Sequence, residues 1–227
     1  MLLLSGGKGT RLKSSLPKQY LKIFEKEIAR YSFELFYKSS LIDQIIVVCE
    51  EEFENIFNKD LEAKGSSKVL FFARPGTERQ DSLKNALKVL EREIHSSPDS
   101  FVLVHDAARP CLEMRDLRRV VAAAKEYGAA LLASPIVATL KKADQQQFVL
   151  NSPKREDMWL AQTPQVMKRR DLEEAIKEFP DLLVTDDCSY IEALKKPVKI
   201  VPATAKNFKI TQLEDLALAE FYLKGMQ

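Results

Sequence analysis

The sequence is poor in the residues that form disulfides and zinc sites. Among 227 residues there are three cysteines and two histidines. Cys49, Cys111 and Cys188 lie far apart and form no Cys-x-x-Cys pair or His/Cys cluster. This spacing argues against a zinc site and a disulfide framework, and it is typical of a protein in a reducing cytosol.

Charge of one sign and long apolar runs are also scarce. The 35 Lys and Arg residues nearly balance the 33 Asp and Glu residues, which leaves a net charge of +2. So small a charge predicts binding to neither nucleic acid nor a membrane surface. No segment approaches the ~18 consecutive apolar residues of a membrane span, and no signal-peptide pattern opens the sequence. We expect a cytoplasmic protein, or a stromal one where a plastid transit segment has been removed.

Glycine is rare as well, but three of the seven glycines, Gly6, Gly7 and Gly9, lie close together after an apolar run. Glycine lets backbone N–H groups approach a ligand closely. Arg11 and Lys18 add positive charge nearby. The combination suits a polyphosphate.

The two common phosphate-binding loops do not fit this stretch. Arg11 stands where a Walker A loop needs its second glycine, and Leu12 stands where the dinucleotide fingerprint needs its third. Taken alone, the stretch is therefore equally compatible with a glycine-rich surface turn.

Apolar runs alternate with helix-like stretches along the chain. The runs are continuous, which is typical of strands covered on both faces of a mostly parallel sheet. They span residues 2–4, 45–49, 69–73, 101–105 and 129–133. Helices are predicted over 79–94, with a capping box at 77–80, over 114–127, and from a second capping box at 211–214. This alternation predicts an α/β, Rossmann-like, doubly wound fold in a single domain spanning 1–227.

Residues 136–157 break that alternation. Two short apolar stretches, 137–140 and 148–150, flank a polar turn, which predicts a protruding β-hairpin arm. A lone hairpin has too little core to be stable by itself. We expect the arm to pack against a second subunit.

Asp106 follows the apolar run 101–105 and should lie at the carboxyl end of the sheet, where ligands collect in such folds. Two interpretations are open for this carboxylate: a helix N-cap, or a ligand of Mg²⁺ held together with substrate phosphates. The neighbouring His105 should point the other way, and we interpret it as structural.

Several motifs in order make the chain resemble the 2-C-methyl-D-erythritol 4-phosphate cytidylyltransferases of the non-mevalonate isoprenoid pathway. The resemblance runs from the N-terminus to the last helix. The motifs are Ser5-Gly6-Gly7-x-Gly9-x-Arg11, Pro17-Lys18-Gln19-Tyr20, Asp81-Ser82, His105-Asp106-Ala107-Ala108-Arg109-Pro110, Ala161-Gln162-Thr163-Pro164-Gln165, Thr185-Asp186-Asp187 and Asn207-x-Lys209-x-Thr211.

The resemblance implies a glycosyltransferase-A-like nucleotide-binding fold, a homodimer and a set of site residues. It implies that CTP lies against Ser5, Gly6, Gly7, Gly9 and Arg11, with Gly76, Thr77 and Ser82 near the base and ribose, and that Mg²⁺ binds Asp106. It implies that the acceptor phosphate lies near Thr139, Arg155, Thr185 and Lys209, with Ala107 and Arg109 close by and Thr163 also in the site. Arg155 would come from the partner subunit.

The chemistry of the reaction favours cations over a base. A phosphomonoester is largely dianionic at neutral pH, so its oxygen can attack the α-phosphate of CTP without a protein base. The protein must instead hold two polyanions together and neutralise the charge that builds up. Arg11 and Lys18 are our candidates for stabilising the transition state, and Arg155 and Lys209 for positioning the acceptor.

Two alternatives stay open. The opening Ser5-Gly6-Gly7 differs from the Ala-Ala-Gly that is frequent in the family. Some relatives that act on ribitol 5-phosphate share this Ser-Gly-Gly opening, so the acceptor could be ribitol 5-phosphate. Lys206 stands where the family commonly has Asp, which weakens any argument for a second carboxylate on the metal. A non-catalytic nucleotide-binding protein on the same fold is the third hypothesis.

Overall fold

The computed structural model describes residues 1–7, 16–58, 68–94 and 96–226. Its centre is a seven-stranded sheet in the order β11-β7-β10-β6-β1-β4-β5. The strands are β1 (Leu2–Leu4), β4 (Ile45–Val48), β5 (Leu70–Ala73), β6 (Phe101–Asp106), β7 (Ala129–Pro135), β10 (Trp159–Lys168) and β11 (Lys199–Pro202). All neighbouring pairs run parallel except the two that involve β10. The predicted mostly parallel α/β sheet is confirmed.

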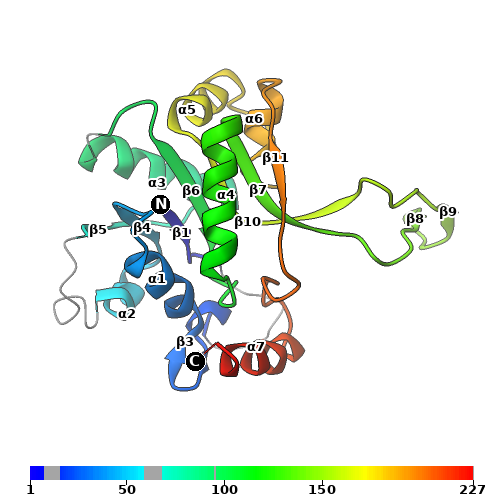
Figure 1. Ribbon diagram of the computed structural model, residues 1–227, viewed down its shortest axis with the longest axis horizontal. Helices are drawn as coiled ribbons and strands as arrows, with labels where there is room; N and C mark the ends of the chain where they lie inside the picture. Colours follow the sequence, from blue (N-terminus) through cyan, green and yellow to red (C-terminus); the bar gives the residue numbers. More distant parts are fainter. Residues whose placement is uncertain (8–15, 59–67, 95, 227) are drawn as a thin grey trace.

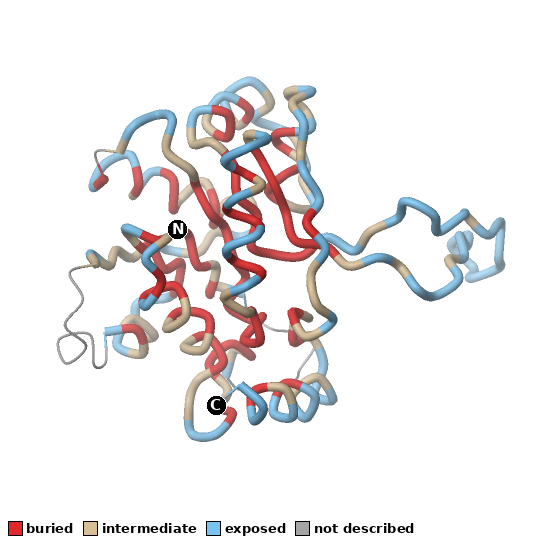
Figure 2. Tube along the Cα trace, in the orientation of Figure 1, coloured by how far each residue is buried: buried red, intermediate tan, exposed pale blue. Residues whose placement is uncertain are grey.

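Helices cover both faces of this sheet (Figure 1). The helices are α1 (Ile28–Lys38), α2 (Glu54–Asn58), α3 (Arg79–Glu93), α4 (Met114–Tyr127), α5 (Arg169–Glu178), α6 (Ser189–Ala193) and α7 (Glu214–Lys224), with 3-10 turns η2 (Lys18–Tyr20) and η3 (Glu51–Phe53). Alternate strand residues enter two cores: Leu3 and Val47 pack with α1, α2 and α4, whereas Leu2 and Ile46 pack with α3, α5 and α6. Figure 2 shows this buried centre.

The last helix closes a third, smaller core below the sheet. Ala219 and Leu223 of α7 are buried there against Ile28 of α1 and Ile23 of the small hairpin β2 (Lys22–Ile23) and β3 (Lys26–Glu27). Ile210 joins them and brings the segment before α7 close to the sheet. The predicted last helix is therefore confirmed, and Ala219 and Leu223 form its buried face.

Two predicted capping boxes are wrong in register. At α3 the box is formed by Glu78 and Asp81 rather than by residues 77–80, because the Asp81 carboxylate accepts the Glu78 N–H at 3.0 Å. At α7 the helix begins at Glu214, and Asp215 reaches back to accept the N–H groups of Thr211 and Gln212 at 2.7 and 2.9 Å. In both cases an aspartate one position further along has the reach that closes the turn.

The arm is present, but its first strand differs from the prediction. The paired strands are β8 (Lys142–Ala143) and β9 (Val149–Asn151), so residues 137–140 form no strand. The carbonyl of Val137 instead accepts a hydrogen bond from Arg155, on the other side of the arm. Figure 1 shows the arm extending away from the sheet, and Figure 2 shows that it is mostly exposed.

Candidate functional site

A cavity of about 360 Å³ opens at the carboxyl ends of β1, β5 and β6. The chain winds from β1 to β4 and β5 on one side and returns to place β6 on the other side of β1, so the cavity lies at the point where the winding reverses. Ligands bind at such points in open α/β sheets. The cavity is lined by Leu4, Gly6, Gly7, Lys18, Gln19, Glu50, Pro75, Gly76, Thr77, Glu78, Arg79, Ser82, Asp106, Ala108, Lys209 and Thr211.

The first edge of the cavity is held by the turn that follows the glycine loop. Gln19 donates from its amide to the carbonyl oxygens of Ser5 and Gly7, at 2.7 and 2.9 Å. The Tyr20 hydroxyl donates to the Ser5 carbonyl at 2.8 Å. These bonds fix the start of the loop against η2, which carries Lys18 into the cavity. Gly9 and Arg11 lie outside the described residues.

Two glycines of the cavity are required by close packing. A Cβ on Gly76 would lie 2.2 Å from the Cβ of Asp81, and a Cβ on Gly6 would lie 2.3 Å from the Cβ of Pro75. These distances are far below van der Waals contact, so a side chain at either position would push apart the β1 loop, the β5 loop and the start of α3. A Cβ on Gly7 would meet nothing within 4 Å.

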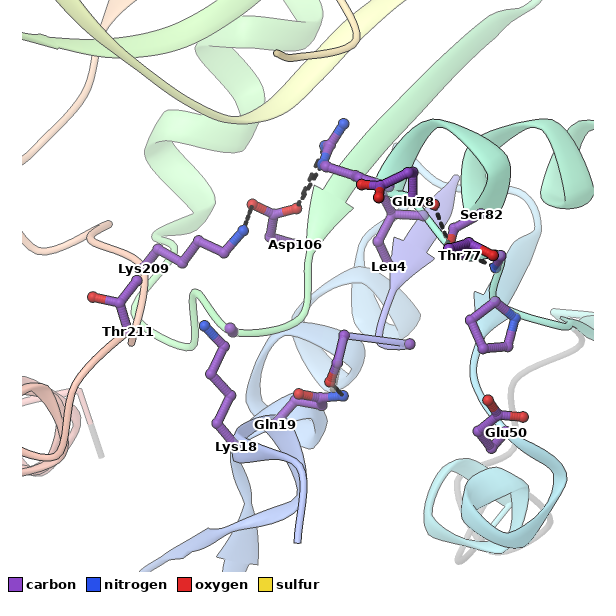
Figure 3. Close-up of a pocket in the computed structure, with 16 residues that line it drawn as sticks. Leu4, Lys18, Gln19, Glu50, Thr77, Glu78, Ser82, Asp106, Lys209 and Thr211 are labelled. Atoms are coloured by element: carbon purple, nitrogen blue, oxygen red, sulfur yellow. Dashed lines mark hydrogen bonds and ion pairs between the residues drawn. The ribbon is translucent and has the colours of Figure 1, made fainter. Parts of the chain in front are cut away.

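Asp106 is the charged centre of the cavity. Its Oδ2 accepts a hydrogen bond from Lys209 at 2.9 Å and lies 3.7 Å from Nε of Arg109, and its Oδ1 lies 3.4 Å from both Nε and Nη2 of Arg79. Burial by itself would raise the pKa of Asp106, but Arg79, Lys209 and Arg109 outweigh it and hold that pKa well below the usual range. Asp106 is therefore ionised at neutral pH. Figure 3 shows Lys18 and Lys209 reaching from different elements toward this carboxylate.

The donor set fits one hard divalent cation that shares its coordination with a ligand. Among the described residues no group of three or more His, Cys, Asp or Glu side chains could hold a metal by itself. Mg²⁺ in phosphate-transfer sites commonly takes one or two carboxylates, with water and phosphate oxygens completing the shell. A single ionised carboxylate in a cavity that also contains Lys18 and Lys209 matches that pattern.

A buried relay behind Asp106 fixes its backbone. The Asp106 N–H donates to Oγ1 of Thr163 at 3.0 Å, and that hydroxyl lies 3.1 Å from Nδ1 of His105. Nε2 of His105 lies 3.3 Å from the Arg109 carbonyl, which can only accept, so Nε2 carries the proton and Nδ1 accepts from Thr163. Burial lowers the pKa of His105 to about 3, so the ring is neutral. His105 is structural, as expected.

A second buried network positions Lys209. The Asn207 amide donates to Oε1 of Gln162 and to the Thr163 carbonyl, both at 2.9 Å. Arg109 in turn donates to the Asn207 carbonyl at 2.9 Å. The segment that leads to α7 is thus tied to the middle of β10, and Lys209 donates to Asp106 at 2.9 Å.

Not all of the predicted residues line this cavity. Gly6, Gly7, Lys18, Gly76, Thr77, Ser82, Asp106 and Lys209 line it. Ser5, Ala107, Arg109 and Thr163 are buried against its wall. Thr185 is exposed outside it, and Thr139 and Arg155 lie on the exposed arm, so their proposed roles need a ligand or a second chain that reaches them.

A pair of charged residues in this region was not predicted from the sequence. Arg79 lines the cavity, and its guanidinium donates two hydrogen bonds to the buried carboxylate of Asp187. The two residues are 108 positions apart. The only signal in the sequence was that Asp187 belongs to the motif Thr185-Asp186-Asp187 and that Arg79 lies just before the motif Asp81-Ser82, although neither residue had itself been assigned a role.

A family model for 2-C-methyl-D-erythritol 4-phosphate cytidylyltransferase matches residues 1–225 of the chain. The chain belongs to this family. The chloroplastic cytidylyltransferase of Oryza sativa subsp. japonica is 39% identical over 97% of this chain and 72% of its own length. The enzyme of that name from Pelotomaculum thermopropionicum is 36% identical over 100% and 94% of the two chains.

Solved structures of the cytidylyltransferase family have the same fold. The crystal structure of 2-C-methyl-D-erythritol 4-phosphate cytidylyltransferase from Francisella tularensis matches with a TM-score of 0.79 at 29% identity, covering 97% of this chain and 98% of that one. The Thermus thermophilus enzyme matches with a TM-score of 0.75 at 27% identity, covering 98% of both chains. The cavity around Asp106 thus belongs to a chain that is a cytidylyltransferase in family and in fold.

Proposed function

We propose that this chain transfers CMP from CTP to 2-C-methyl-D-erythritol 4-phosphate and releases pyrophosphate, as a step of isoprenoid biosynthesis. Membership of the family supports cytidylyl transfer. The observation that carries the assignment of the site is the arrangement around Asp106: one ionised carboxylate, ringed by cations, in a cavity at the reversal point of the sheet.

The acceptor phosphate acts as its own nucleophile in this reaction. One of its oxygens forms a bond to the α-phosphorus of CTP while the bond to the β-phosphate oxygen breaks, and pyrophosphate leaves with that electron pair. A phosphomonoester already carries close to two negative charges at neutral pH. No general base is required, which agrees with a site whose neighbouring histidine is buried and, with a pKa lowered to about 3 by burial, is a weak base.

The main contribution of the protein is fixed positive charge around the phosphates. Lys18 lines the cavity beside the glycine edge, where we place the phosphates of CTP. Lys209 lies at the opposite side of Asp106, where we place the acceptor phosphate. Arg11 completes the proposed set for the transition state. Preorganised cations of this kind stabilise charge as it develops and bring the two anions into line.

Asp106 would hold Mg²⁺ through its carboxylate, with the CTP phosphates completing the coordination. Bound there, the ion would supply Lewis-acid neutralisation of the phosphate oxygens. The nucleotide would lie against Ser5, Gly6, Gly7 and Gly9, with its base and ribose near Gly76, Thr77 and Ser82. Thr163 supports Asp106 from behind by accepting its N–H, and the next residue, Ala107, donates its N–H to the Leu4 carbonyl of β1.

The arm at 136–157 supports the proposal of a homodimer. Val137, Phe148, Val149 and Leu150 expose 59 to 80% of their surface, which is unusual for apolar side chains on a single chain. Pairing of two arms would bury them. We place Thr139 and Arg155 of the arm in the acceptor site of the second copy, opposite Thr185 and Lys209, and we treat 1–227 as one domain.

We locate the reaction in the cytoplasm or in a plastid stroma. Within the described part of the chain no helix is long and apolar enough to cross a membrane. The relative from Oryza sativa is named chloroplastic.

The acceptor is tested by measuring pyrophosphate release with CTP and Mg²⁺, offering each polyol phosphate separately. We expect turnover with 2-C-methyl-D-erythritol 4-phosphate. Turnover only with ribitol 5-phosphate would mean that the chain catalyses the same cytidylyl transfer in another pathway. The Ser5-Gly6-Gly7 opening, which some ribitol 5-phosphate enzymes share, is the reason for testing this acceptor. A folded protein that binds CTP and turns over neither acceptor would refute the enzyme assignment.

A further inference from the structure

Arg79 joins two carboxylates of different character. Its Nη1 and Nη2 donate to Oδ1 and Oδ2 of Asp187 at 2.5 and 2.7 Å, a bidentate arrangement. Its other edge, Nε and Nη2, faces Oδ1 of Asp106 at 3.4 Å. Charge-assisted N–H···O bonds are normally 2.7–2.9 Å long. The guanidinium is therefore bound firmly to Asp187 and only loosely to Asp106.

Asp187 is held in place by a residue in the central part of β10, Gln165. It is fully buried, with 0% of its surface exposed. Gln165 accepts the N–H of the next residue, Cys188, at 2.8 Å and donates to the carboxylate of the preceding residue, Asp186, at 3.0 Å. Both neighbours of Asp187 are thus anchored to one glutamine side chain. The carboxylate has a fixed position from which it can direct Arg79.

The two oxygens of Asp106 differ in how tightly they are held. Oδ2 accepts the short bond from Lys209 and lies near Arg109. Oδ1 meets only the two long contacts from Arg79 among the contacts of the described residues. Oδ1 is therefore the oxygen that a divalent cation can take with the least loss of existing bonds.

We propose that Asp187 is a positioning residue for the site. By occupying the guanidinium fork of Arg79, it prevents Arg79 from closing bidentately on Asp106 and so leaves Oδ1 available to a cation that arrives with the nucleotide. An arginine fork matches a carboxylate geometrically, so without Asp187 the nearest available partner for it is Asp106. This inference rests on the proposed function, because it assumes that Asp106 binds the cation.

The test measures metal binding rather than turnover. Mn²⁺ is titrated into the enzyme with CTP and no acceptor, and binding is followed by the Mn²⁺ EPR signal. Asp187→Asn keeps the shape of the side chain but removes the charge that holds the fork. We expect the dissociation constant for Mn²⁺ to rise about tenfold or more, as is typical when a group that supports a metal ligand is lost.

A second change distinguishes this mechanism from general damage to the site. The double variant Arg79→Gln with Asp187→Asn has no fork that could capture Asp106, so its Mn²⁺ affinity should return close to that of the wild type. Asp171→Asn is the matched control, because Asp171 is also buried and paired with a cation, Lys196 at 2.9 Å, but does not line the cavity. The control should bind Mn²⁺ as the wild type does.

Three results would overturn the inference. One is unchanged Mn²⁺ affinity in a folded Asp187→Asn variant, and another is equal weakness in the double variant. If Asp187→Asn does not fold, Arg79→Lys is measured in its place. A lysine pairs with Asp187 but cannot close bidentately on Asp106, so this variant should keep its Mn²⁺ affinity. A tenfold loss of Mn²⁺ affinity in Arg79→Lys would be the third result that overturns the inference. If the wild-type enzyme with CTP binds Mn²⁺ no more tightly than free CTP does, the metal assignment of the proposed function is refuted, and the inference with it.

Discussion

Single residues of this site act through their neighbours. Asp106 is ionised only because three cations outweigh the cost of its burial. His105 is neutral because burial disfavours its protonated form and so lowers its pKa. The neutral ring lets Nδ1 accept a hydrogen bond from Thr163. The charge and position of the residues proposed to bind ligand thus depend on neighbouring residues. A single substitution can test each of these dependences.

The stability of the protein should fall in mild acid, partly because of His105. The folded pKa of about 3 is below the unfolded value of about 6.5, so the folded state binds fewer protons. The contribution of neutral His105 to the free energy of unfolding is fully present above pH 6.5 and is lost as the pH falls toward 3. Between pH 7 and pH 5.5 we expect this residue to cost about 1 kcal/mol of unfolding free energy.

Urea unfolding at these two pH values measures the effect in the wild type and in His105→Gln. Glutamine can keep the hydrogen bond to the Arg109 carbonyl but does not titrate. The variant should be less stable at pH 7 and should show a loss smaller by about 1 kcal/mol on acidification. An identical pH dependence in both proteins would contradict the assignment of a buried neutral ring.

Lys18 should be required for catalysis and not for folding. Lys18→Ala removes a cation from the cavity edge, and we expect kcat/KM to fall about a hundredfold or more, as for other groups that stabilise a developing anion. Lys22→Ala is the matched control, because its side chain is 53% exposed nearby on β2 and does not line the cavity. Similar small losses in both variants would argue that general positive charge, rather than Lys18, is what matters.

At the scale of elements, the segment 207–211 and the start of α7 work as one unit that positions Lys209. Asp215 accepts the N–H groups of Thr211 and Gln212 and also the Thr211 hydroxyl, at 2.7 to 3.0 Å. Burial opposes the charge of Asp215, but these donors lower its pKa. The first turn of α7 is therefore held by one carboxylate two residues beyond the usual capping position.

Asp215→Ala should loosen this unit. We expect a loss of about 1 kcal/mol in unfolding free energy, the usual value for a lost cap, together with a raised KM for the acceptor. Thermal unfolding and steady-state kinetics measure the two effects, with the exposed neighbour Glu214→Ala as the control. A change in kcat with no change in the acceptor KM would contradict the proposed link to Lys209.

The elements that the sequence predicted correctly are those with a clear apolar period. The helices predicted over 79–94 and 114–127 are such elements: Leu83, Leu87 and Leu90 fall at helical spacing and are buried in α3, and Gly128, with φ of 93°, ends α4. β10 was missed because three of its central side chains, Gln162, Thr163 and Gln165, are polar and buried. Such residues are stable inside only through hydrogen bonds to distant segments, which no local pattern reveals.

The same limit applies to the site. The glycine loop, Lys18 and Asp106 stand in motifs and could be found from them. The pairing of Arg79 with Asp187 could not, because it depends on how α3 and the turn before α6 are placed on the sheet.

At the scale of the whole molecule, the position of the arm predicts a site shared between two chains. The arm extends away from the rest of its own chain (Figure 1), so Arg155 is proposed to complete the cavity of a partner. In a two-fold dimer each cavity would then take its body residues from one chain and Arg155 from the other.

Mixing two impaired variants tests the shared site. Arg155→Ala and Lys18→Ala are each expected to retain little activity, but a heterodimer would contain one intact site. Refolded or co-expressed in equal amounts, they should recover about a quarter of the wild-type activity, because about half of the dimers are mixed and each mixed dimer has one working site of two. No recovery in a mixture shown to contain heterodimers would mean that Arg155 acts within its own chain.

The most direct test of the whole account is to follow the reaction by ³¹P NMR. Enzyme, CTP, Mg²⁺ and 2-C-methyl-D-erythritol 4-phosphate are incubated, with Asp106→Asn as the inactive control. We expect the acceptor's monophosphate signal to be replaced by a pair of coupled diphosphate signals and free pyrophosphate to appear in equal amount, and we expect the variant to produce neither. Release of pyrophosphate with the acceptor signal unchanged, or no reaction by a folded enzyme that binds CTP, would contradict it.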